Sequence, residues 1–306
     1  MAESKLLITQ YTDPICIWCY ALDAPLRKVE FLAPGRVEFR DVLGLLVGDS
    51  KDIVGDDESS SMRFAQLQSQ MRSHFVDAAT RGSLPISLKH MDGIRPEDVT
   101  SLPASLAIEA MKGLDEVQAR RYLRRIREAF HSDDLNTSRT EVLLSLASEF
   151  PVDQQAMRAA LEDGRAVATL QRDLDECRSA GVTGFPTLKL EYAGRSRMVH
   201  GFVDYQTLKA SIDSVTGGEL EIKERAYTPE ALTEFATMFG RVTAGEISAA
   251  FNMDEQQTEE ASDLLARSGM FVREERETSW FVRSASQGSC DPMTGVCSFG
   301  VVGDAR

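Results

Sequence analysis

The chain has 306 residues and a formal net charge of -14, with 42% hydrophobic and 27% charged residues. This length accommodates two domains with a sizeable core, and the composition is typical of a globular protein. The negative charge argues against partners with a phosphate backbone and against anionic membrane surfaces. The opening residues MAESKLLITQYTD lack the features of a secretory signal, and no apolar run has the length of a membrane span. We therefore expect a cytoplasmic protein, in which the five cysteines serve catalysis, redox sensing or metal binding rather than structural disulfides.

The first elements in chain order are two strands joined by a helix. Residues 6–12 (LLITQYT) are apolar and β-branched, which predicts a buried strand. A helix is predicted from Cys16 to Phe31 with a kink at Pro25, and residues 36–47 (RVEFRDVLGLLV) predict a second strand. A strand, a crossover helix and a second strand favour a parallel pair. The acidic, serine-rich residues that follow, 48–62, lack periodicity and predict a loop.

Helical periodicity dominates from Met62 to about Ala180, and strand character returns in residues 185–202 (FPTLKLEYAGRSRMVHGF). Two alternating runs in that stretch flank an Ala-Gly-Arg-Ser turn, which predicts a hairpin. Residues 204–215 then predict a helix that carries its apolar side chains on one face. Strands at both ends with helices between them predict one α/β sheet interrupted by a large helical insertion.

The last part of the chain follows a polar linker, residues 219–228. Three helical patterns, in residues 228–239, 243–252 and 254–269, precede a hairpin in residues 270–282. This order predicts a small winged-helix-like domain over residues 226–285, followed by a flexible cysteine-containing tail, residues 286–306. The third helix would be the recognition helix of a DNA-binding domain. Its charges would repel phosphates, so we expect a protein partner and no nucleic acid; they are Asp254, Glu255, Glu259, Glu260 and Asp263.

Residues 13–20 (DPICIWCY) place Cys16 and Cys19 in a Cys-x-x-Cys pair. Such a pair either contributes to a metal site, together with further ligands, or exchanges electrons with other thiols. Redox chemistry needs the first cysteine at a helix N-terminus, and Cys16 follows a predicted strand and an Asp-Pro turn. From this geometry we expect Cys16 to be the accessible thiol with a lowered pKa, and Cys19 to resolve a mixed disulfide. The pair alone leaves both chemistries open.

Residues 181–188 (GVTGFPTL) place Pro186 directly before a predicted strand. A proline at a strand start is common by itself, with a trans or a cis bond before it. Together with DPICIWCY, the long helical segment and LNTSRTEVLLSLASEF, however, this stretch resembles the DsbA-like branch of the thioredoxin superfamily. The resemblance covers roughly residues 5–218. It is greatest to the group of FrnE-type cytoplasmic oxidoreductases, SpxH-type adaptors and 2-hydroxychromene-2-carboxylate isomerases.

This resemblance implies a thioredoxin fold, built from residues 1–60 and 181–218, with an inserted helical domain over residues 61–180. Ile17 and Phe185 occupy positions that vary in the family and tune the redox potential, so the direction of electron flow is not implied. The isomerases of this group generally lack the two cysteines, so isomerase chemistry is not expected. The residues implied for the site are Cys16, Cys19 and a cis Pro186 for catalysis, with Trp18, Gly184 and Phe185 for substrate binding.

Cys290 and Cys297, in SCDPMTGVC, form a second spaced pair in the tail. We predict a second redox pair that exchanges with the first, as FrnE-type proteins carry an additional cysteine pair near the C-terminus with a different spacing. Two bystander thiols, or a zinc site made from both pairs, are the alternatives. Cys177 is expected to be structural. Asp41 is expected at an exposed strand edge, with proton acceptance from Cys19 as the alternative.

We therefore predict a cytoplasmic thiol–disulfide oxidoreductase that acts on protein or small-molecule thiols by mixed-disulfide exchange and needs no cofactor and no metal. The four histidines show no metal-type spacing. The alternative is a redox-responsive adaptor of the SpxH type that binds a protein partner without turnover. The winged-helix-like domain is the expected partner surface, and a second copy of the chain is a further candidate partner.

Overall fold

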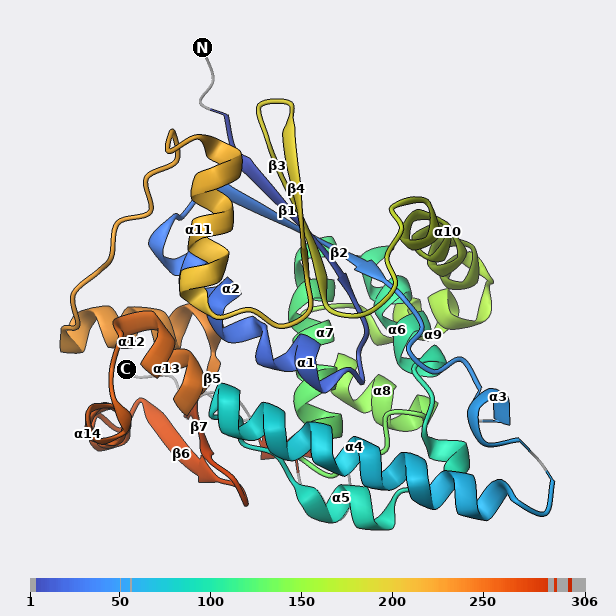
Figure 1. Cartoon of the computed structure of the whole chain (residues 1–306). Helices are drawn as coiled ribbons and strands as arrows, with labels where there is room; N and C mark the ends of the chain where they lie inside the picture. The colour runs from blue at the N-terminus through green and yellow to red at the C-terminus, as the bar shows by residue number, and fades with distance from the viewer. Residues whose placement is uncertain (1–3, 50, 56, 286–288, 291–296, 299–306) are drawn as a thin grey trace.

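The computed structural model describes residues 4–49, 51–55, 57–285, 289–290 and 297–298. Its main sheet has four strands in the order β2-β1-β3-β4. β1 (Leu6–Thr12) pairs in parallel with β2 (Val37–Leu43) and antiparallel with β3 (Thr187–Tyr192), which pairs with β4 (Arg195–His200). β1 and β3 are far apart in the sequence but lie side by side in the middle of the sheet (Figure 1).

The β3–β4 hairpin turns more tightly than predicted. Ala193 and Gly194 both have positive φ, 47° and 81°, which is the backbone of a mirror-image two-residue turn. Arg195, which the sequence placed in the turn, already pairs with Tyr192 in the ladder. The turn is therefore Ala-Gly rather than Ala-Gly-Arg-Ser.

The segment after β1 forms two helices instead of one kinked helix. α1 (Ile17–Ala21) and α2 (Asp23–Leu32) meet at Leu22. Pro25 has no N–H to donate to the carbonyl of Ala21, four residues earlier, which accounts for the break at this place.

Helices α3 to α10 lie between β2 and β3 in the chain and form the predicted helical insertion. α3 lies inside the predicted loop, where the Asp49 carboxylate accepts the backbone N–H of Lys51 at 2.9 Å and starts the helix. The insertion has its own apolar core, with Ala107, Tyr122 and Leu143 among its buried residues. The helices are α3 (Lys51–Val54), α4 (Ser60–Gly82), α5 (Leu88–Gly93), α6 (Leu102–Lys112), α7 (Glu116–His131), α8 (Thr140–Ala147), α9 (Gln154–Glu162) and α10 (Arg165–Ser179), with a 3₁₀ turn at Pro96–Asp98.

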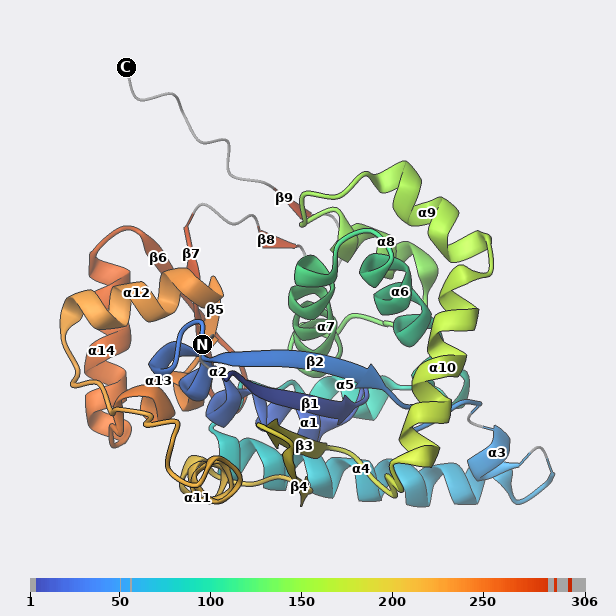
Figure 2. The same cartoon turned by 90° about the horizontal axis from the view of Figure 1, so that it is seen from above.

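The sheet is covered on both sides. α2 and α11 (Tyr205–Thr216) pack Leu26 and Leu208 against Ile8 of β1 on one face. On the other face, Tyr11 and Val42 meet side chains of α10 and of the segment before β3 (Figure 2). The predicted α/β thioredoxin fold with a helical insertion is thus confirmed. Within the described residues, no helix has both the length and the apolar character needed to cross a bilayer.

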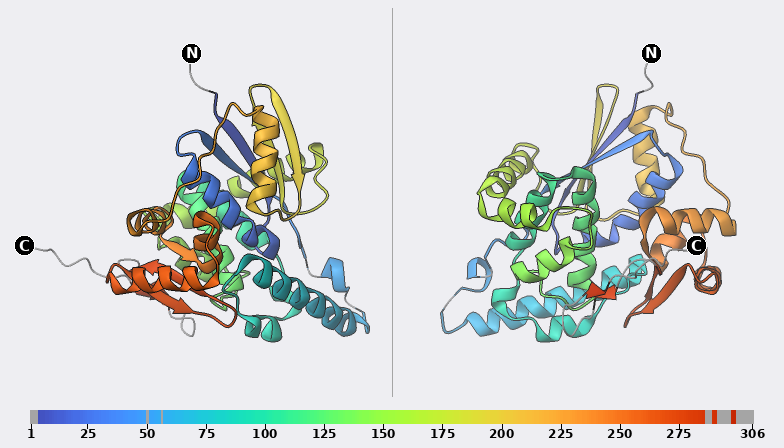
Figure 3. Two further views of the ribbon diagram at one scale, coloured as in Figure 1. Left: turned by 60° about the vertical axis from the view of Figure 1, so that its left-hand side comes forward. Right: turned by 180° about the vertical axis from the view of Figure 1, so that it is seen from behind.

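The C-terminal part has the order of a winged helix. α12 (Pro229–Phe239), α13 (Ala244–Phe251) and α14 (Glu255–Arg267) pack against a three-stranded sheet in the order β5-β7-β6 (Figure 3). β6 (Phe271–Glu275) and β7 (Trp280–Ser284) are the predicted hairpin. β5 (Arg241–Thr243) was not predicted, because three residues are too short to show an alternating pattern. We call residues 229–284 the winged-helix-like module.

The wing, residues 276–279 between β6 and β7, lies against the rest of the chain. The Thr278 hydroxyl donates to the Leu84 carbonyl at 2.6 Å and accepts the Ile86 N–H at 2.9 Å. The Arg276 Nε donates to the Ser132 carbonyl at 2.9 Å. In a DNA-binding winged helix the wing would be free to meet the duplex, whereas here it joins the module to the helical insertion.

Candidate active site

Cys16 and Cys19 lie at the start of α1, directly after the C-terminal end of β1. Cys16 is the N-cap of α1, and its sulfur accepts the backbone N–H of Cys19 at 3.4 Å. Cys19 lies on the first turn of the same helix. The helix start predicted from the sequence is therefore present. The Cys16 sulfur accepts a backbone N–H that has no carbonyl partner within the helix.

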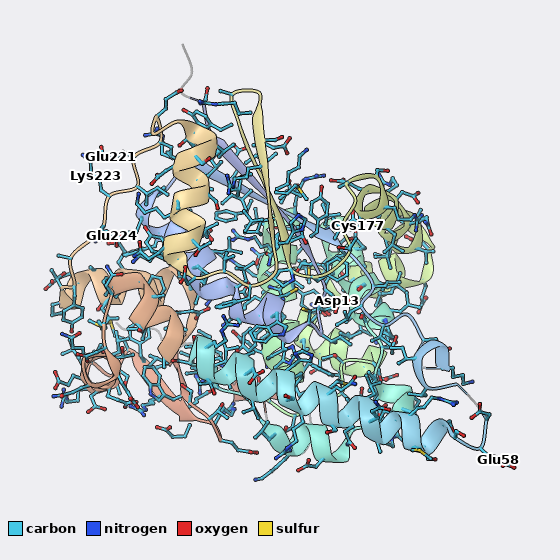
Figure 4. The ribbon with its side chains drawn as sticks, in the orientation of Figure 1. Asp13, Glu58, Cys177, Glu221, Lys223 and Glu224 are labelled. Carbon is cyan, nitrogen blue, oxygen red and sulfur yellow. The ribbon has the colours of Figure 1, made fainter. Side chains whose placement is uncertain are left out.

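Asp13 fixes the loop that leads into this helix. It is fully buried, and its two oxygens accept the backbone N–H groups of Ile15 and Leu46, each at 2.8 Å. The carboxylate also hydrogen-bonds the Ser101 side chain at the start of α6. Burial raises the pKa of Asp13, and these hydrogen bonds oppose the rise. Asp13 lies in the interior, at the point where β1 meets the helical insertion (Figure 4).

The Gly-Phe-Pro-Thr segment, residues 184–187, meets the loop of residues 13–16, which we call the cysteine loop. The peptide bond between Phe185 and Pro186 is cis, as the resemblance implies. The Cys16 thiol donates to the Phe185 carbonyl at 3.6 Å, and the Thr187 hydroxyl holds the Gly184 carbonyl at 2.8 Å. Because Tyr11 pairs with Thr187, the β1–β3 ladder brings this segment to the end of β1 where the cysteines begin.

The Phe185 ring also packs closely against Gly44. A Cβ atom on Gly44, directly after β2, would lie only 1.9 Å from the Cζ atom of the Phe185 ring. Only glycine leaves room for this ring in its present position. The sequence pattern around Gly44 held no sign of this contact.

The structure contradicts the expected exposure of Cys16. Cys16 is 4% exposed and Cys19 is 0% exposed, so both thiols are buried and only their order agrees with the prediction. The pKa of Cys16 is raised well above its ordinary value rather than lowered. The hydrogen bond with the Cys19 side chain is the largest cause, followed by burial and by the nearby charges of Cys19 and Asp13. The Cys19 N–H acts in the opposite direction but does not offset them.

An aromatic cluster borders the cysteines on the α4 side. The Trp18 Nε1 lies 3.4 Å from the His74 Nδ1, and the Trp18 ring is 5.8 Å from the Phe202 ring. The Arg81 guanidinium lies over both rings, 5.7 Å from Trp18 and 5.5 Å from Phe202. Trp18 is half-buried, so part of this cluster reaches the surface beside Cys16.

A buried charged cluster lies on the opposite side of α1. Arg127 of α7 donates to Asp23 at 2.8 Å and to the Thr12 hydroxyl. Asp41, expected at an exposed edge, is instead half-buried, and burial raises its pKa against the opposing charges of Arg120 and Arg127. Arg127 is not among the residues predicted for the site. The available signal was an arginine within the apolar positions of ARRYLRRIREAF.

The other cysteines lie apart from this pair. Cys177 is buried in α10 beside Tyr11, and burial raises its pKa to about 11, as suits the structural role expected (Figure 4). The side chains of Cys290 and Cys297 lie outside the described part of the chain. Their backbones are described: β8 (Ser289–Cys290) and β9 (Cys297–Ser298) pair antiparallel, with Cys290 opposite Cys297. This ladder lies beside α7 and α8, away from α1 (Figure 2).

Residues 10–209 match the family model described as Thioredoxin. The chain belongs to the thioredoxin family. Over more of its length it is similar to the ClpXP adapter protein SpxH of Bacillus subtilis (strain 168), with 22% identity over 292 residues, covering 93% of this chain and 91% of that protein. This similarity extends across the winged-helix-like module, which the family model does not reach.

Two solved structures share the fold of this thioredoxin-family chain. A putative protein disulfide isomerase from Nitrosomonas europaea matches with a TM-score of 0.56 and 14% identity, over 69% of this chain and 97% of that chain. The cytosolic disulfide reductase DsbM from Pseudomonas aeruginosa matches with a TM-score of 0.51 and 23% identity, over 67% of this chain and 92% of that chain. Both likenesses show the thioredoxin fold that the sequence resemblance implies.

Proposed function

We propose that this thioredoxin-family protein is a thiol–disulfide oxidoreductase that works at Cys16 and Cys19. The observation that carries the proposal is the position of the Cys16 sulfur. It lies at a helix start, 3.4 Å from the Cys19 N–H and 3.6 Å from the Phe185 carbonyl of the Gly-Phe-Pro-Thr segment. A thiol at a helix start with a second thiol one turn away is suited to two successive exchange steps.

In the reducing direction, the Cys16 thiolate attacks a substrate disulfide and forms a mixed disulfide, releasing one substrate thiolate. Cys19, as thiolate, then attacks the Cys16 sulfur. The Cys16–Cys19 bond forms, the mixed disulfide breaks, and the second substrate thiolate leaves. The substrate gains two electrons and the cysteine pair loses two; the reverse sequence oxidises a substrate dithiol.

The substrate site is proposed to combine the two segments that flank Cys16. Trp18 offers a half-buried ring on the α4 side, while Gly184 and Phe185 offer backbone groups on the β3 side. An extended peptide could pair with the backbone there and rest a side chain on the Trp18 ring. We propose a reducing cytoplasm as the compartment, because the DsbM relative is described as cytosolic.

Cys290 and Cys297 are proposed as a second redox pair. Residues directly opposite in an antiparallel ladder have Cα atoms about 4.5–5.5 Å apart, within the range that a disulfide spans. Exchange with the first pair requires the β8–β9 ladder to leave its place beside α7. A protein with Cys290→Ser and Cys297→Ser should then keep the first step at Cys16 and lose multiple turnover with its native electron partner.

A second candidate is an adaptor role. It is favoured by the similarity to SpxH, which covers the winged-helix-like module as well as the thioredoxin-like part. In this case the module would bind a protein partner, and the cysteines would act as a switch without turnover.

Turnover separates the two candidates. The wild-type chain should reduce insulin or oxidise reduced, unfolded ribonuclease over many cycles, and Cys16→Ala should abolish both reactions. Cys177→Ala is the matched control, because it removes a cysteine of α10 whose thiol donates to the Leu43 carbonyl of β2. An adaptor would show no turnover in either assay, while still binding its partner with all five cysteines intact.

A further inference from the structure

This inference rests on the proposed exchange reaction and concerns its second step. Cys19 must react as a thiolate, yet it has no exposed surface, so water does not stabilise that charge. Asp23 follows four residues later, and Leu22 between α1 and α2 keeps helical dihedral angles. Residues four apart on a helical segment share one face, and a helical side chain leans toward the preceding turn. The Asp23 side chain therefore lies on the side of Cys19.

Arg127 reaches this same side from α7. Its Nη1 donates to the Asp23 carboxylate at 2.8 Å, and its Nη2 donates to the hydroxyl of Thr12, the last residue of β1. Thr12 and Asp23 flank the two cysteines in the sequence, so the guanidinium bridges the two ends of the cysteine segment. It is 2% exposed and lies within electrostatic range of the Cys19 sulfur.

The charge of Arg127 is only partly neutralised by its partner. The other oxygen of Asp23 already pairs with Arg124 at 2.8 Å, so one carboxylate serves two guanidinium groups. Arg124 has further carboxylates, Glu128 and Glu246, whereas Asp23 is the one ion-pair partner that Arg127 shows within the described chain. The buried Nε of Arg127 also makes no hydrogen bond to any residue that the structure describes. A residual positive charge thus lies within electrostatic range of Cys19.

We propose that Arg127 is a positioning residue for the resolving step, holding a fixed positive charge beside the Cys19 thiolate that attacks the mixed disulfide. In this step the Cys19–Cys16 bond forms, the mixed disulfide breaks, and the proton that Cys19 loses ends on the departing substrate thiolate. Arg127 stays protonated throughout, since a guanidinium does not titrate in this range. The carboxylates of Asp13, Asp23 and Asp41, from the loop, α2 and β2, lie within electrostatic range of Arg127 and act in the opposite direction.

The test follows the resolving step alone, in full-length protein with Cys290→Ser and Cys297→Ser to remove the tail thiols. One equivalent of a chromogenic aromatic disulfide reacts with Cys16, and acid quenching with mass spectrometry then measures how fast the Cys16 adduct converts to the Cys16–Cys19 disulfide. In Arg127→Gln the pH profile of this conversion should move to higher pH, because a positive charge at close range favours a negatively charged group. The rate at neutral pH should fall about threefold or more. The loss of thiolate lowers the rate, and the greater nucleophilicity of a more basic thiolate offsets only part of this loss.

Three further variants make the result specific. Arg127→Lys keeps the charge and should restore most of the profile. Asp23→Asn removes a negative charge and should move the pH profile to lower pH, opposite to the change in Arg127→Gln. This variant tests the inference even if Arg127→Gln does not fold. Arg125→Gln, on the same helix and also paired with two carboxylates, should leave the profile unchanged. The inference is overturned if Arg127→Gln or Asp23→Asn has the same pH profile as the protein that lacks only the tail thiols. Adducts at Cys16 in these proteins would still support the proposed exchange chemistry. Failure of Cys16 to form any adduct overturns the proposed function itself, and this inference with it.

Discussion

The cysteine loop and the winged-helix-like module are both fastened to the rest of the chain, but through different groups. The loop is held mainly through the backbone: Asp13 binds two backbone N–H groups, and the Cys16 thiol meets the Phe185 carbonyl. The module is held mainly through charged side chains, with Arg241 on Asp133 and Arg27 on Glu246. Both sets of contacts include a carboxylate, but burial raises the pKa of Asp13 at the loop, whereas nearby arginines lower the pKa of Asp133 at the module. The cysteine loop and the winged-helix-like module should therefore respond differently to mutation, pH and salt.

The largest effect is expected at the ion pairs of the module. Arg241 donates to both oxygens of Asp133 at 2.9 and 3.0 Å, and Arg125 and Arg276 pair with the same carboxylate. Arg241→Met should lower the free energy of unfolding by about 3–5 kcal/mol, because it removes one of the guanidinium groups that compensate the charge of Glu128, Asp133 and Glu274. Urea denaturation followed by far-UV circular dichroism measures this. A loss below about 1 kcal/mol, as for exposed pairs, would contradict the account.

The same ion pairs set the acid response of the module. The three arginines hold the pKa of Asp133 well below its usual range, although burial opposes them. A lowered folded-state pKa gives stability that is present above the unfolded value of about 3.9 and is lost as pH falls toward the folded value. The free energy of unfolding of the wild type should thus decline below about pH 4, and Asp133→Asn should lack that part of the decline. Identical pH profiles for the two proteins would show that Asp133 is not the group responsible.

A glycine at the module boundary should give the next largest effect. A Cβ atom on Gly245 in α13 would lie 1.8 Å from the backbone oxygen of Gly82, at the end of α4. Gly245→Ala should cost about 1–3 kcal/mol, because rigid backbone has to move. Gly113→Ala, whose nearest neighbour would be 3.4 Å away, is the matched control and should be nearly neutral. Equal melting temperatures for the two variants would count against this packing.

At the cysteine loop, Gly44→Ala should change reactivity more than stability. The added methyl group would meet the end of the Phe185 ring, a side chain that can turn away more easily than backbone. We expect a stability loss of about 1 kcal/mol and a several-fold change in the rate of adduct formation at Cys16, since Phe185 also supplies the carbonyl beside that thiol. Gly48→Ala has no heavy atom within 4 Å and serves as the control. Unchanged adduct formation in Gly44→Ala would show that the ring does not govern access.

The smallest expected effect is a shift in the titration of Cys16. The pKa of Cys16 is raised, chiefly by the hydrogen bond with Cys19. The alkylation rate of Cys16 should therefore be low at neutral pH and increase only at a pH above the ordinary pKa range of thiols. Cys19→Ala removes that hydrogen bond and should move the alkylation profile to lower pH. Peptide mapping after timed alkylation gives the profile for Cys16 alone. A profile already complete near neutral pH in the wild type would restore the expectation drawn from the helix start.

The elements that have a local sequence pattern could be predicted. The run 6–12 and the stretch after Pro186 predicted β1 and β3, and the Cys-x-x-Cys pair predicted a helix start at Cys16. Contacts between distant segments were out of reach, because local periodicity carries no information about which side chains meet. Phe185 over Gly44 and Arg127 beside Asp23 are contacts of this kind. The burial of Cys16 was missed for the same reason, since the Phe185 segment meets it only in the folded chain.

The most direct test of the central claim is to trap the mixed disulfide in a Cys19→Ser protein that also carries Cys290→Ser and Cys297→Ser. After incubation with oxidised glutathione, intact-mass and peptide-mapping mass spectrometry should find one glutathione on Cys16, because no resolving thiol remains to release it. The adduct should be absent from Cys16→Ser and should disappear within seconds to minutes from the wild type as the Cys16–Cys19 disulfide forms. A Cys19→Ser protein with Cys16 unmodified, or with glutathione on Cys177 instead, would contradict the assignment of Cys16 as the nucleophile.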